Sequence, residues 1–284
     1  MKLTDISTIK ALMAEFGTVF KKKYGQNFLI SERVLGEIAD NADVAALEIG
    51  PGIGSLTAFL CERAEKVCAV EIDDSLIPIL SRTLADYDNV EVINADAMKI
   101  DLAALCREQF GDRPVSVCAN LPYYITTPVL TRLLECGVKF TNVTVMIQKE
   151  VAQRLCAKPG SPDYGAISVF VAYYGSPKKI LNVPAGCFVP APKVDSAVVR
   201  IDIHDKPPVE GDPALLFRVV RAAFGQRRKT LYNALSTGFS ELGKERIAAV
   251  LAEAGVEPAV RGEKLSLEEF AAISRVIEKS INNL

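Results

Sequence analysis

Residues Asn120-Leu121-Pro122-Tyr123 carry no charge and follow Pro114–Ala119, a short apolar run of the kind that forms a buried strand. The Asn120 side-chain oxygen and the Leu121 carbonyl could each accept a hydrogen bond from an exocyclic base amine. They would hold that nitrogen nearer to tetrahedral, with its lone pair directed at an electrophile. Pro122 would fix the turn and Tyr123 would stack on the base. The loop therefore predicts a reaction at a base amine, and a buried proline turn with core tyrosines is the alternative.

A glycine-rich turn, Gly50-Pro51-Gly52-Ile53-Gly54, follows another strand-like run and leads into a helix. Its glycines would let a ligand come close to the backbone. Glu71 lies 21 residues after Gly50, near the end of the next strand. A carboxylate there accepts both ribose hydroxyls of an adenosine-bearing cofactor. Asp96 ends the third strand and is expected to accept from the adenine amino group, unless it caps a helix.

The glycine spacing separates the candidate cofactors. A dinucleotide site prefers G-x-G-x-x-G, whereas this turn reads G-x-G-x-G, and no lysine follows it to make a phosphate-binding P-loop. S-adenosylmethionine contains a ribose and an adenine but no phosphate. We therefore expect S-adenosylmethionine as the cofactor, with an ordinary tight strand–helix turn as the alternative.

Five short apolar runs alternate with helical patterns, which predicts a parallel sheet wrapped by helices. The expected strands are Val44–Ile49, Lys66–Ile72, Val90–Asn94, Val115–Ala119 and Asn142–Ile147. The helices between them are expected to begin after Gly54, near Asp74 and at Thr127, which is predicted as an N-cap before Pro128.

Two further strands are predicted at Gly165–Tyr174 and Ser196–Ile203, so that the sheet finishes with an antiparallel pair. The stretch 204–213 then has the composition of a linker. Everything after it reads as helical, and Ser266-Leu-Glu-Glu269 is a capping box that opens the last helix.

This order of elements predicts an α/β fold with a small C-terminal all-helical domain. Together with the expected S-adenosylmethionine site, it leads us to expect a Rossmann-like class I S-adenosylmethionine-dependent methyltransferase sheet. We expect a catalytic domain over residues 1–205, including a basic N-terminal segment over 1–30. A helical domain is expected over residues 206–284.

The composition limits the class of protein. With 284 residues, 49% of them hydrophobic, and a net charge of −2, the chain can bury a sizeable core but is not globally basic. Seven scattered cysteines and a single histidine favour a reducing compartment and argue against a zinc site. The N-terminus lacks a secretory pattern, and no apolar run approaches the length of a membrane span. We expect a cytoplasmic protein without metal or membrane association.

These motifs together resemble the family of small-subunit ribosomal RNA adenine N6,N6-dimethyltransferases over essentially the whole chain. The matching stretches are Tyr24–Leu29, Glu48–Gly52, Val70–Asp73, Asp96-Ala97, Asn120–Tyr123, Phe188–Ser196 and Arg227–Leu231. The resemblance implies dimethylation of two adjacent adenosines in the 3′-terminal hairpin of small-subunit rRNA. It further implies action on the pre-30S particle, a role in small-subunit biogenesis, and a monomeric enzyme.

The resemblance also implies which residues form the site. S-adenosylmethionine is expected to contact Asn27, Leu29, Gly50, Glu71, Asp96 and Asn120. The residues expected to act on the base are Asn120, Leu121, Pro122, Tyr123 and Phe188, with the adenine between Tyr123 and Phe188. One position departs from the family pattern, because Tyr232 stands where similar proteins usually carry an arginine.

Two basic clusters are predicted to contact RNA phosphates, which would position the RNA without reading its sequence. They are Lys21, Lys22 and Lys23 near the N-terminus, and Arg218, Arg221, Arg227, Arg228 and Lys229 in the helical domain. The helical domain is therefore expected to bind RNA. Ordinary solvated surface is the alternative for both clusters.

Three rival functions stay open on sequence grounds. A resistance-type methyltransferase would modify an adenine of large-subunit rRNA with the same chemistry. A DNA adenine methyltransferase would need a target-recognition domain, for which the residues after the linker are few. A ribosome-assembly factor would contribute mainly by binding, although the intact Asn-Leu-Pro-Tyr loop favours a working catalyst.

Overall fold

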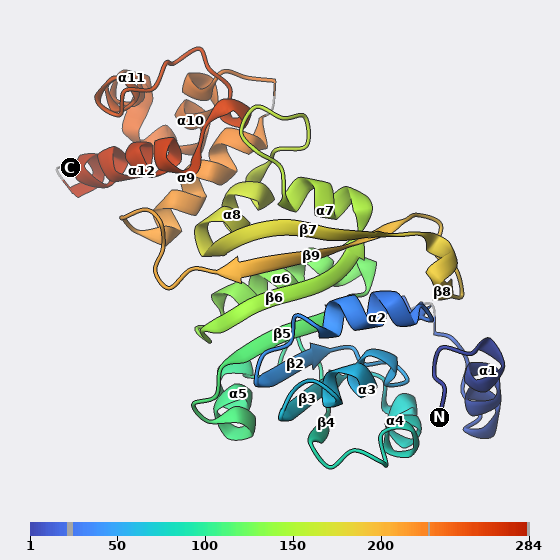
Figure 1. Ribbon diagram of the computed structural model, residues 1–284. Helices are drawn as coiled ribbons and strands as arrows, with labels where there is room; N and C mark the ends of the chain where they lie inside the picture. Colours follow the sequence, from blue (N-terminus) through green and yellow to red (C-terminus); the bar gives the residue numbers. More distant parts are fainter. Residues whose placement is uncertain (22–24, 227, 283–284) are drawn as a thin grey trace. The chain divides into compact units, whose positions relative to one another are not determined.

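The computed structural model describes residues 1–21, 25–226 and 228–282. These residues form two compact units (Figure 1). The first consists of Met1–Ala152 and Lys178–Ile203, and the second consists of Gln153–Pro177 and the chain from His204 onward. The chain passes for the last time from the first unit to the second between Ile203 and His204, two residues before the expected boundary at 205/206, and residues 153–177 pack with the C-terminal helices.

The first unit is built on a seven-stranded sheet with the order β4-β3-β2-β5-β6-β9-β7. The strands are β2 (Ala45–Ile49), β3 (Lys66–Glu71), β4 (Val90–Asn94), β5 (Val115–Asn120), β6 (Phe140–Gln148), β7 (Gly175–Val183) and β9 (Ser196–Ile203). The pairs from β4 through β6 are parallel, and β9 runs antiparallel to β6. The five parallel strands predicted from the sequence are confirmed to within a few residues.

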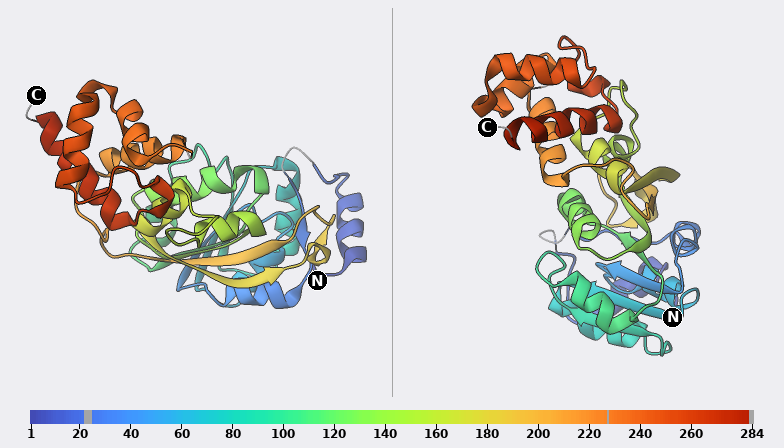
Figure 2. Two further views of the ribbon diagram at one scale, coloured as in Figure 1. Left: turned by 90° about the horizontal axis from the view of Figure 1, so that it is seen from above. Right: turned by 90° about the vertical axis from the view of Figure 1, so that its left-hand side faces the viewer.

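The strand order reverses between β2 and β5, because β3 and β4 lie on one side of β2 and β5 and β6 on the other. Right-handed crossovers then place the connecting helices on both faces of the sheet, as Figure 2 shows. The helices of this unit are α1 (Ile6–Glu15), α2 (Glu32–Ala39), α3 (Ser55–Cys61), α4 (Ile77–Thr83), α5 (Leu102–Phe110) and α6 (Thr126–Glu135), with α7 (Lys149–Leu155) at its boundary. A reversal of this kind creates a crevice at the carboxyl ends of the strands.

Helices α2 and α3 cover one face of the sheet with fully buried side chains. Leu35 and Ile38 of α2 and Leu60 of α3 are 0% exposed and pack with strand residues such as Val67 and Met146. Apolar side chains at this spacing fall on one side of a helix, which explains why each short helix docks by a single face.

The start of α6 differs from the prediction. Thr127 was expected to be the N-cap, but the helix begins at Thr126, directly after a 3-10 turn over Tyr123–Ile125. The Thr126 hydroxyl donates to the Pro122 carbonyl at 3.2 Å. The proline turn and the helix are thus continuous, which gives the Asn-Leu-Pro-Tyr loop a rigid support.

A second, two-stranded antiparallel sheet pairs β1 (Phe28–Leu29) with β8 (Phe188–Val189). It brings together two segments that are some 160 residues apart in the chain, with Leu29 opposite Phe188. Both side chains are buried in the core beneath α2 and α3.

The second unit is helical, and one predicted strand in it is wrong. Residues Ala166–Tyr174, expected as a strand, form helix α8. The remaining helices are α9 (Pro213–Gly225), α10 (Leu231–Gly238), α11 (Gly243–Glu253) and α12 (Leu267–Asn282). Val169 and Tyr173 of α8 are buried in the same core as Phe217 and Phe270. An uninterrupted apolar run fits a buried helix as well as a buried strand.

The capping box at the start of α12 is confirmed, because Ser266 N–H donates to Glu269 Oε2 at 2.7 Å and Glu269 N–H donates to Ser266 Oγ at 3.3 Å. None of the helices in the described part of the chain is both long enough and apolar enough to span a bilayer.

Candidate active site

A pocket lies at the carboxyl ends of β2, β3, β4 and β5, beside the reversal of strand order. Every residue predicted to bind the cofactor or to act on the base lines it. These residues are Asn27, Leu29, Gly50, Glu71, Asp96, Asn120, Leu121, Pro122, Tyr123 and Phe188. Motifs that are scattered through the chain therefore meet at one edge of the sheet.

The turn after β2 has left-handed backbone at Gly50 (φ 73°) and Gly52 (φ 62°), a conformation that other residues rarely adopt. A Cβ atom at Gly50 would meet no other atom within 4 Å. At Gly52 it would lie 3.0 Å from the Phe28 ring of β1. The turn thus leaves room for a ligand beside Gly50 and packs closely against the N-terminal segment at Gly52.

Glu71, at the end of β3, is oriented by two backbone donors. Its Oε2 accepts from Gly52 N–H at 3.0 Å and its Oε1 from Asp73 N–H at 2.8 Å. Burial raises the pKa of this carboxyl, and the two N–H donors act against that rise. A carboxylate offers about four acceptor positions, so Glu71 retains capacity for the hydroxyls of a ribose.

Asp96 lies two residues beyond β4 and forms a turn. Its Oδ1 accepts from Met98 N–H at 2.9 Å, and its Oδ2 lies 3.5 Å from Lys99 Nζ. Asp96 does not cap the following helix, because α5 begins only at Leu102 and its N-cap is Asp101. Asp96 keeps its place on the pocket wall.

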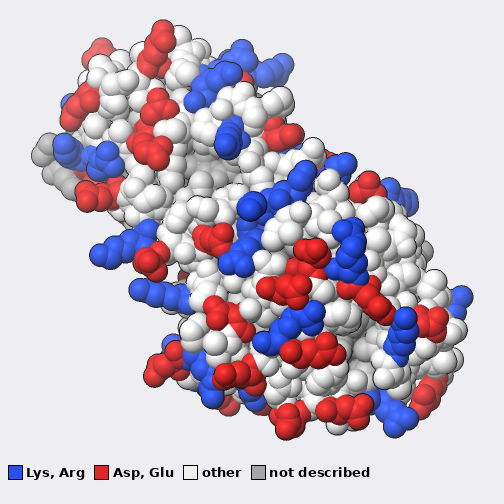
Figure 3. Space-filling model, in the orientation of Figure 1, with Lys and Arg blue, Asp and Glu red and all other residues white. Residues whose placement is uncertain are grey.

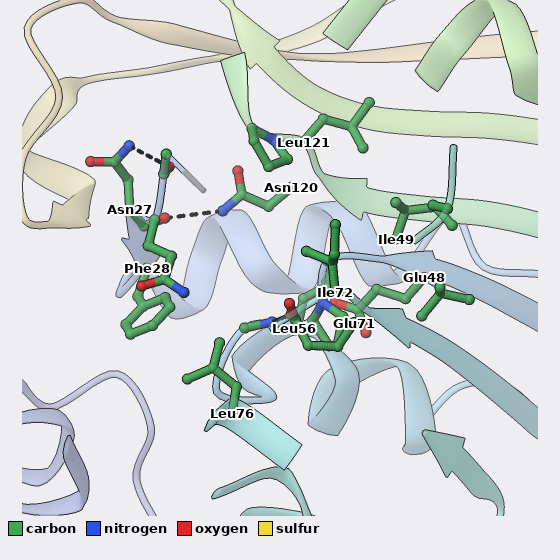
Figure 4. A pocket seen from close by; sticks show the side chains of 18 of the residues that line it. Asn27, Phe28, Glu48, Ile49, Leu56, Glu71, Ile72, Leu76, Asn120 and Leu121 are labelled. Carbon is green, nitrogen blue, oxygen red and sulfur yellow. Dashed lines mark hydrogen bonds between the residues drawn. The ribbon is translucent and has the colours of Figure 1, made fainter. Parts of the chain in front are cut away.

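Asn120 ends β5, and its amide nitrogen is anchored. Nδ2 donates to the Asn27 carbonyl at 3.2 Å, while the Asn27 side chain donates to the Gly25 carbonyl at 3.0 Å (Figure 4). With its nitrogen occupied in this way, the Asn120 amide retains its oxygen as an acceptor. This is the group that the sequence predicts to receive an N–H bond from a base.

The two aromatic residues are held differently. The Tyr123 hydroxyl forms a 2.6 Å hydrogen bond with Ser196 Oγ, which fixes the far end of the ring. Phe188 is only 3% exposed and packs in the core with Leu29 while also lining the pocket. The structure therefore brings both rings to one cavity, with Phe188 serving the core as well.

Glu48 is a pocket residue that the sequence reasoning did not assign to the site. It is the second-to-last residue of β2, is 1% exposed, and lines the pocket. Within the described residues its Oε2 has no hydrogen-bond partner. Burial raises the pKa of Glu48 to about 8, and the nearby Glu71 carboxylate adds to the rise. The sequence does contain a sign that Glu48 belongs to the site, because a glutamate two residues before the glycine turn interrupts an otherwise apolar strand.

The basic residues divide into two groups. Arg221, Arg228 and Lys229 are exposed in the second unit, as the phosphate-contact prediction requires. Arg218 instead donates to Gly238 and Glu241 and lies over the Phe239 ring, 4.2 Å from its centroid. Positive and negative side chains intermingle over most of the face drawn in Figure 3.

In the N-terminal cluster, Lys21 is ion-paired with the buried Asp73 at 2.6 Å. Lys22, Lys23 and Arg227, which were also predicted to contact RNA, lie outside the described residues. Within those residues, no group of three or more histidine, cysteine, aspartate or glutamate side chains is arranged to hold a metal ion.

Comparison with known proteins decides the family. Residues 17–279 match the model of the family described as ribosomal RNA adenine dimethylase. The chain belongs to this family. A protein from Alkaliphilus metalliredigens named ribosomal RNA small subunit methyltransferase A is 47% identical over 281 residues, which cover 97% of this chain and 98% of the relative.

Solved structures agree with this membership. A dimethyladenosine transferase from Plasmodium falciparum has a TM-score of 0.77 and 25% identity, covering 89% of this chain and 98% of that one. The 23S rRNA methyltransferase ErmE has a TM-score of 0.67 and 27% identity, covering 89% and 100%. The predicted fold class is confirmed.

As a ribosomal RNA adenine dimethylase, the protein is an enzyme that uses S-adenosylmethionine as methyl donor and rRNA as substrate. The pocket suits that cofactor on its own geometry. The cofactor has a ribose and an ammonium group. The pocket offers open space beside the Gly50 backbone, an oriented carboxylate at Glu71, and an oxygen of Glu48 that has no hydrogen-bond partner among the described residues. When bound, the cofactor supplies an electrophilic methyl group.

Proposed function

We propose that the enzyme dimethylates the N6 amines of two adjacent adenosines in the 3′-terminal hairpin of small-subunit rRNA, acting as a monomer on the pre-30S particle. The level of similarity supports this substrate. A relative named for the small subunit is 47% identical over nearly the whole chain. Among the solved structures, the dimethyladenosine transferase is more similar in fold (TM-score 0.77) than the 23S rRNA methyltransferase (TM-score 0.67), although both are about equally distant in sequence. The resistance-type alternative is correspondingly less favoured.

The observation that carries the proposed chemistry is the anchored amide of Asn120. Its nitrogen is held by the Asn27 carbonyl, so its oxygen is available to accept an N–H bond from the target amine. The Leu121 carbonyl is the second proposed acceptor. Two acceptors would draw the amine nitrogen out of conjugation with the ring and direct its lone pair at the methyl donor. No charged base is required, because the methylated nitrogen loses its proton readily.

The proposed roles of the remaining residues follow from their places in the pocket. Glu71 would accept the ribose hydroxyls, and Asp96 the adenine amino group of the cofactor. Tyr123 would stack on the target base with Phe188 on its other side. We assign RNA phosphate contacts to Arg221, Arg228 and Lys229, which are exposed on the helical unit.

The substrate is tested by methyl transfer to matched RNAs. The enzyme should methylate adenosines of a partly assembled small subunit from a strain that lacks the gene. Mass spectrometry should locate two dimethylated adenosines side by side near the 3′ end. Naked large-subunit RNA of equal concentration should stay unmodified, and its efficient methylation would transfer the enzyme to the resistance-type group.

A further inference from the structure

Asp73 is a fully buried carboxylate that follows the pocket residues Glu71 and Ile72 and accepts hydrogen bonds from Lys21 and Gln26. Its Oδ1 accepts from Lys21 Nζ at 2.6 Å and from Ser75 Oγ at 2.8 Å, and its Oδ2 accepts from Gln26 Nε2 at 2.8 Å. Lys21 and Gln26 are also joined to each other, because Lys21 N–H donates to Gln26 Oε1 at 2.6 Å. Two side chains of the N-terminal segment therefore converge on one buried charge.

The same aspartate is connected to the cofactor side of the pocket. Its backbone N–H donates to Glu71 Oε1 at 2.8 Å, which is one of the two bonds that orient the proposed ribose acceptor. A rotation of the Asp73 backbone would therefore disturb Glu71 directly.

The network is also connected to the catalytic side. Gln26 directly precedes Asn27, and the Asn27 carbonyl accepts the bond from Asn120 Nδ2 at 3.2 Å. A continuous path of hydrogen bonds and one peptide link thus runs from Glu71 through Asp73 and Gln26 to the Asn120 amide. Figure 4 shows the end of this path, where Asn27 and Asn120 face each other.

The Asp73 carboxylate depends on its hydrogen-bond donors. Desolvation alone would raise the pKa of Asp73, but hydrogen bonds from Lys21, Ser75 and Gln26 hold it below its usual range. A buried carboxylate is stable only with such partners, and removal of one partner leaves an uncompensated charge. The Lys21 ammonium group, 2.6 Å from Asp73 Oδ1, is therefore needed as a partner of this buried charge.

We propose that Lys21, Gln26 and Asp73 are positioning residues that seat residues 25–29 on the pocket and align the Glu71 carboxylate and the Asn120 amide. In this proposal Lys21 supports cofactor binding and catalysis by holding Asp73 in place, and it does not contact an RNA phosphate. This assignment rests on the cofactor role of the pocket and on the proposed role of Asn120.

The first test measures cofactor affinity by calorimetry without RNA, so that its outcome does not depend on the substrate proposal. Lys21→Met and Gln26→Leu should each weaken binding of S-adenosylhomocysteine about tenfold or more, because each removes a hydrogen bond to a charged group. Lys21→Arg, which can still reach Asp73, should restore most of the affinity. Lys10→Met, at an exposed lysine of α1, is the matched control and should bind as wild type.

The second test separates the two roles of Lys21. In filter binding of RNA across a salt series, Lys21→Met should keep the wild-type slope. A slope flattened by about 0.7–0.9, the change expected when one phosphate interaction is removed, together with intact cofactor affinity would overturn the proposal. If Lys21→Met is too unstable to purify, the double variant Lys21→Met/Asp73→Asn removes both charges and should show the same weak cofactor binding.

The third test addresses Asn120. At saturating cofactor and RNA, Lys21→Met should lower kcat in the wild-type background, but should lower it much less in an Asn120→Ala background, because the effect passes through that amide. Equal losses of kcat in both backgrounds would show that the network does not act on Asn120, and would overturn that part of the proposal.

Discussion

Glu48 is a buried carboxylic acid in an otherwise apolar strand, and it lines the pocket. With a pKa of about 8 in the folded protein and an ordinary value of 4.5, it holds a proton that the unfolded chain releases. Folding therefore binds a proton between those two values. The free energy of unfolding should fall as pH rises from about 4.5 to 8, by about 1.4 kcal/mol per pH unit from this group, and then level off.

Glu48→Gln should remove this dependence, because the amide does not titrate. Urea unfolding at pH 5, 6.5 and 8 should show the variant gaining stability relative to wild type as pH rises. Glu37→Gln, at an exposed glutamate of α2, is the control and should track the wild type. Parallel curves for wild type and Glu48→Gln would contradict the raised pKa.

Tyr123 allows the ring and its hydroxyl to be tested separately. Tyr123→Phe loses only the bond to Ser196, worth about 0.5–1.5 kcal/mol, so single-turnover methyl transfer should slow by no more than about tenfold. Tyr123→Ala also loses base stacking, worth about 1–3 kcal/mol per base, and should be slower still. Ser196→Ala should match Tyr123→Phe. If the Phe and Ala variants at Tyr123 transfer at the same rate, the ring does not stack on the base.

At the scale of elements, the glycine turn between β2 and α3 offers a matched pair of substitutions. Gly50 and Gly52 both have positive φ, so an alanine at either should cost roughly 1–2 kcal/mol in backbone strain. Only at Gly52 would the new Cβ press on the Phe28 ring, at 3.0 Å. Gly52→Ala should therefore lower the thermal unfolding midpoint more than Gly50→Ala does.

A Phe28→Leu background should shrink that difference, because the smaller side chain can move away from the new methyl group. Thermal unfolding is measured without cofactor, so that ligand affinity does not enter. Equal midpoints for Gly50→Ala and Gly52→Ala would show that β1 does not press on the turn.

Elements with a local signature were predictable, and those decided by packing were not. Each parallel strand is followed by residues that favour a turn or a helix start. The capping-box pattern specifies both of its residues, Ser266 and Glu269, from the sequence alone. Residues 166–174 carry no such signal. Their β-branched and aromatic side chains favour a strand, but Val169 and Tyr173 are buried one helical turn apart against α9 and α12. Tertiary contacts of that kind cannot be read from a single run of residues.

At the scale of the whole molecule, the pocket residues were predictable because their motifs sit at strand ends that a parallel sheet must bring together. Glu48 and the Asp73 network were missed because their importance lies in burial and in partners far along the chain. The domain division was misplaced for residues 153–177 for a similar reason. Tyr164, for example, donates to the Leu265 carbonyl at 2.9 Å, a contact between residues about 100 positions apart.

The exposed cations of the helical unit give the last prediction. Arg221, Arg228 and Lys229 are exposed, and each phosphate interaction that we propose for them would release counterions. Replacing all three with glutamine should flatten the salt slope of RNA affinity by roughly 0.7–0.9 for each phosphate interaction removed. Cofactor affinity should stay unchanged, because every residue that lines the pocket belongs to the other unit.

Two controls make this slope informative. Lys244→Gln/Lys279→Gln removes exposed positive charge elsewhere on the same unit and should alter the slope much less. Arg218→Gln should lower the unfolding midpoint and leave the slope unchanged, because its guanidinium is bonded to Glu241 and lies over Phe239. If the triple variant binds RNA with the wild-type slope while its fold is intact, these cations are ordinary surface, and the RNA must be held by other residues.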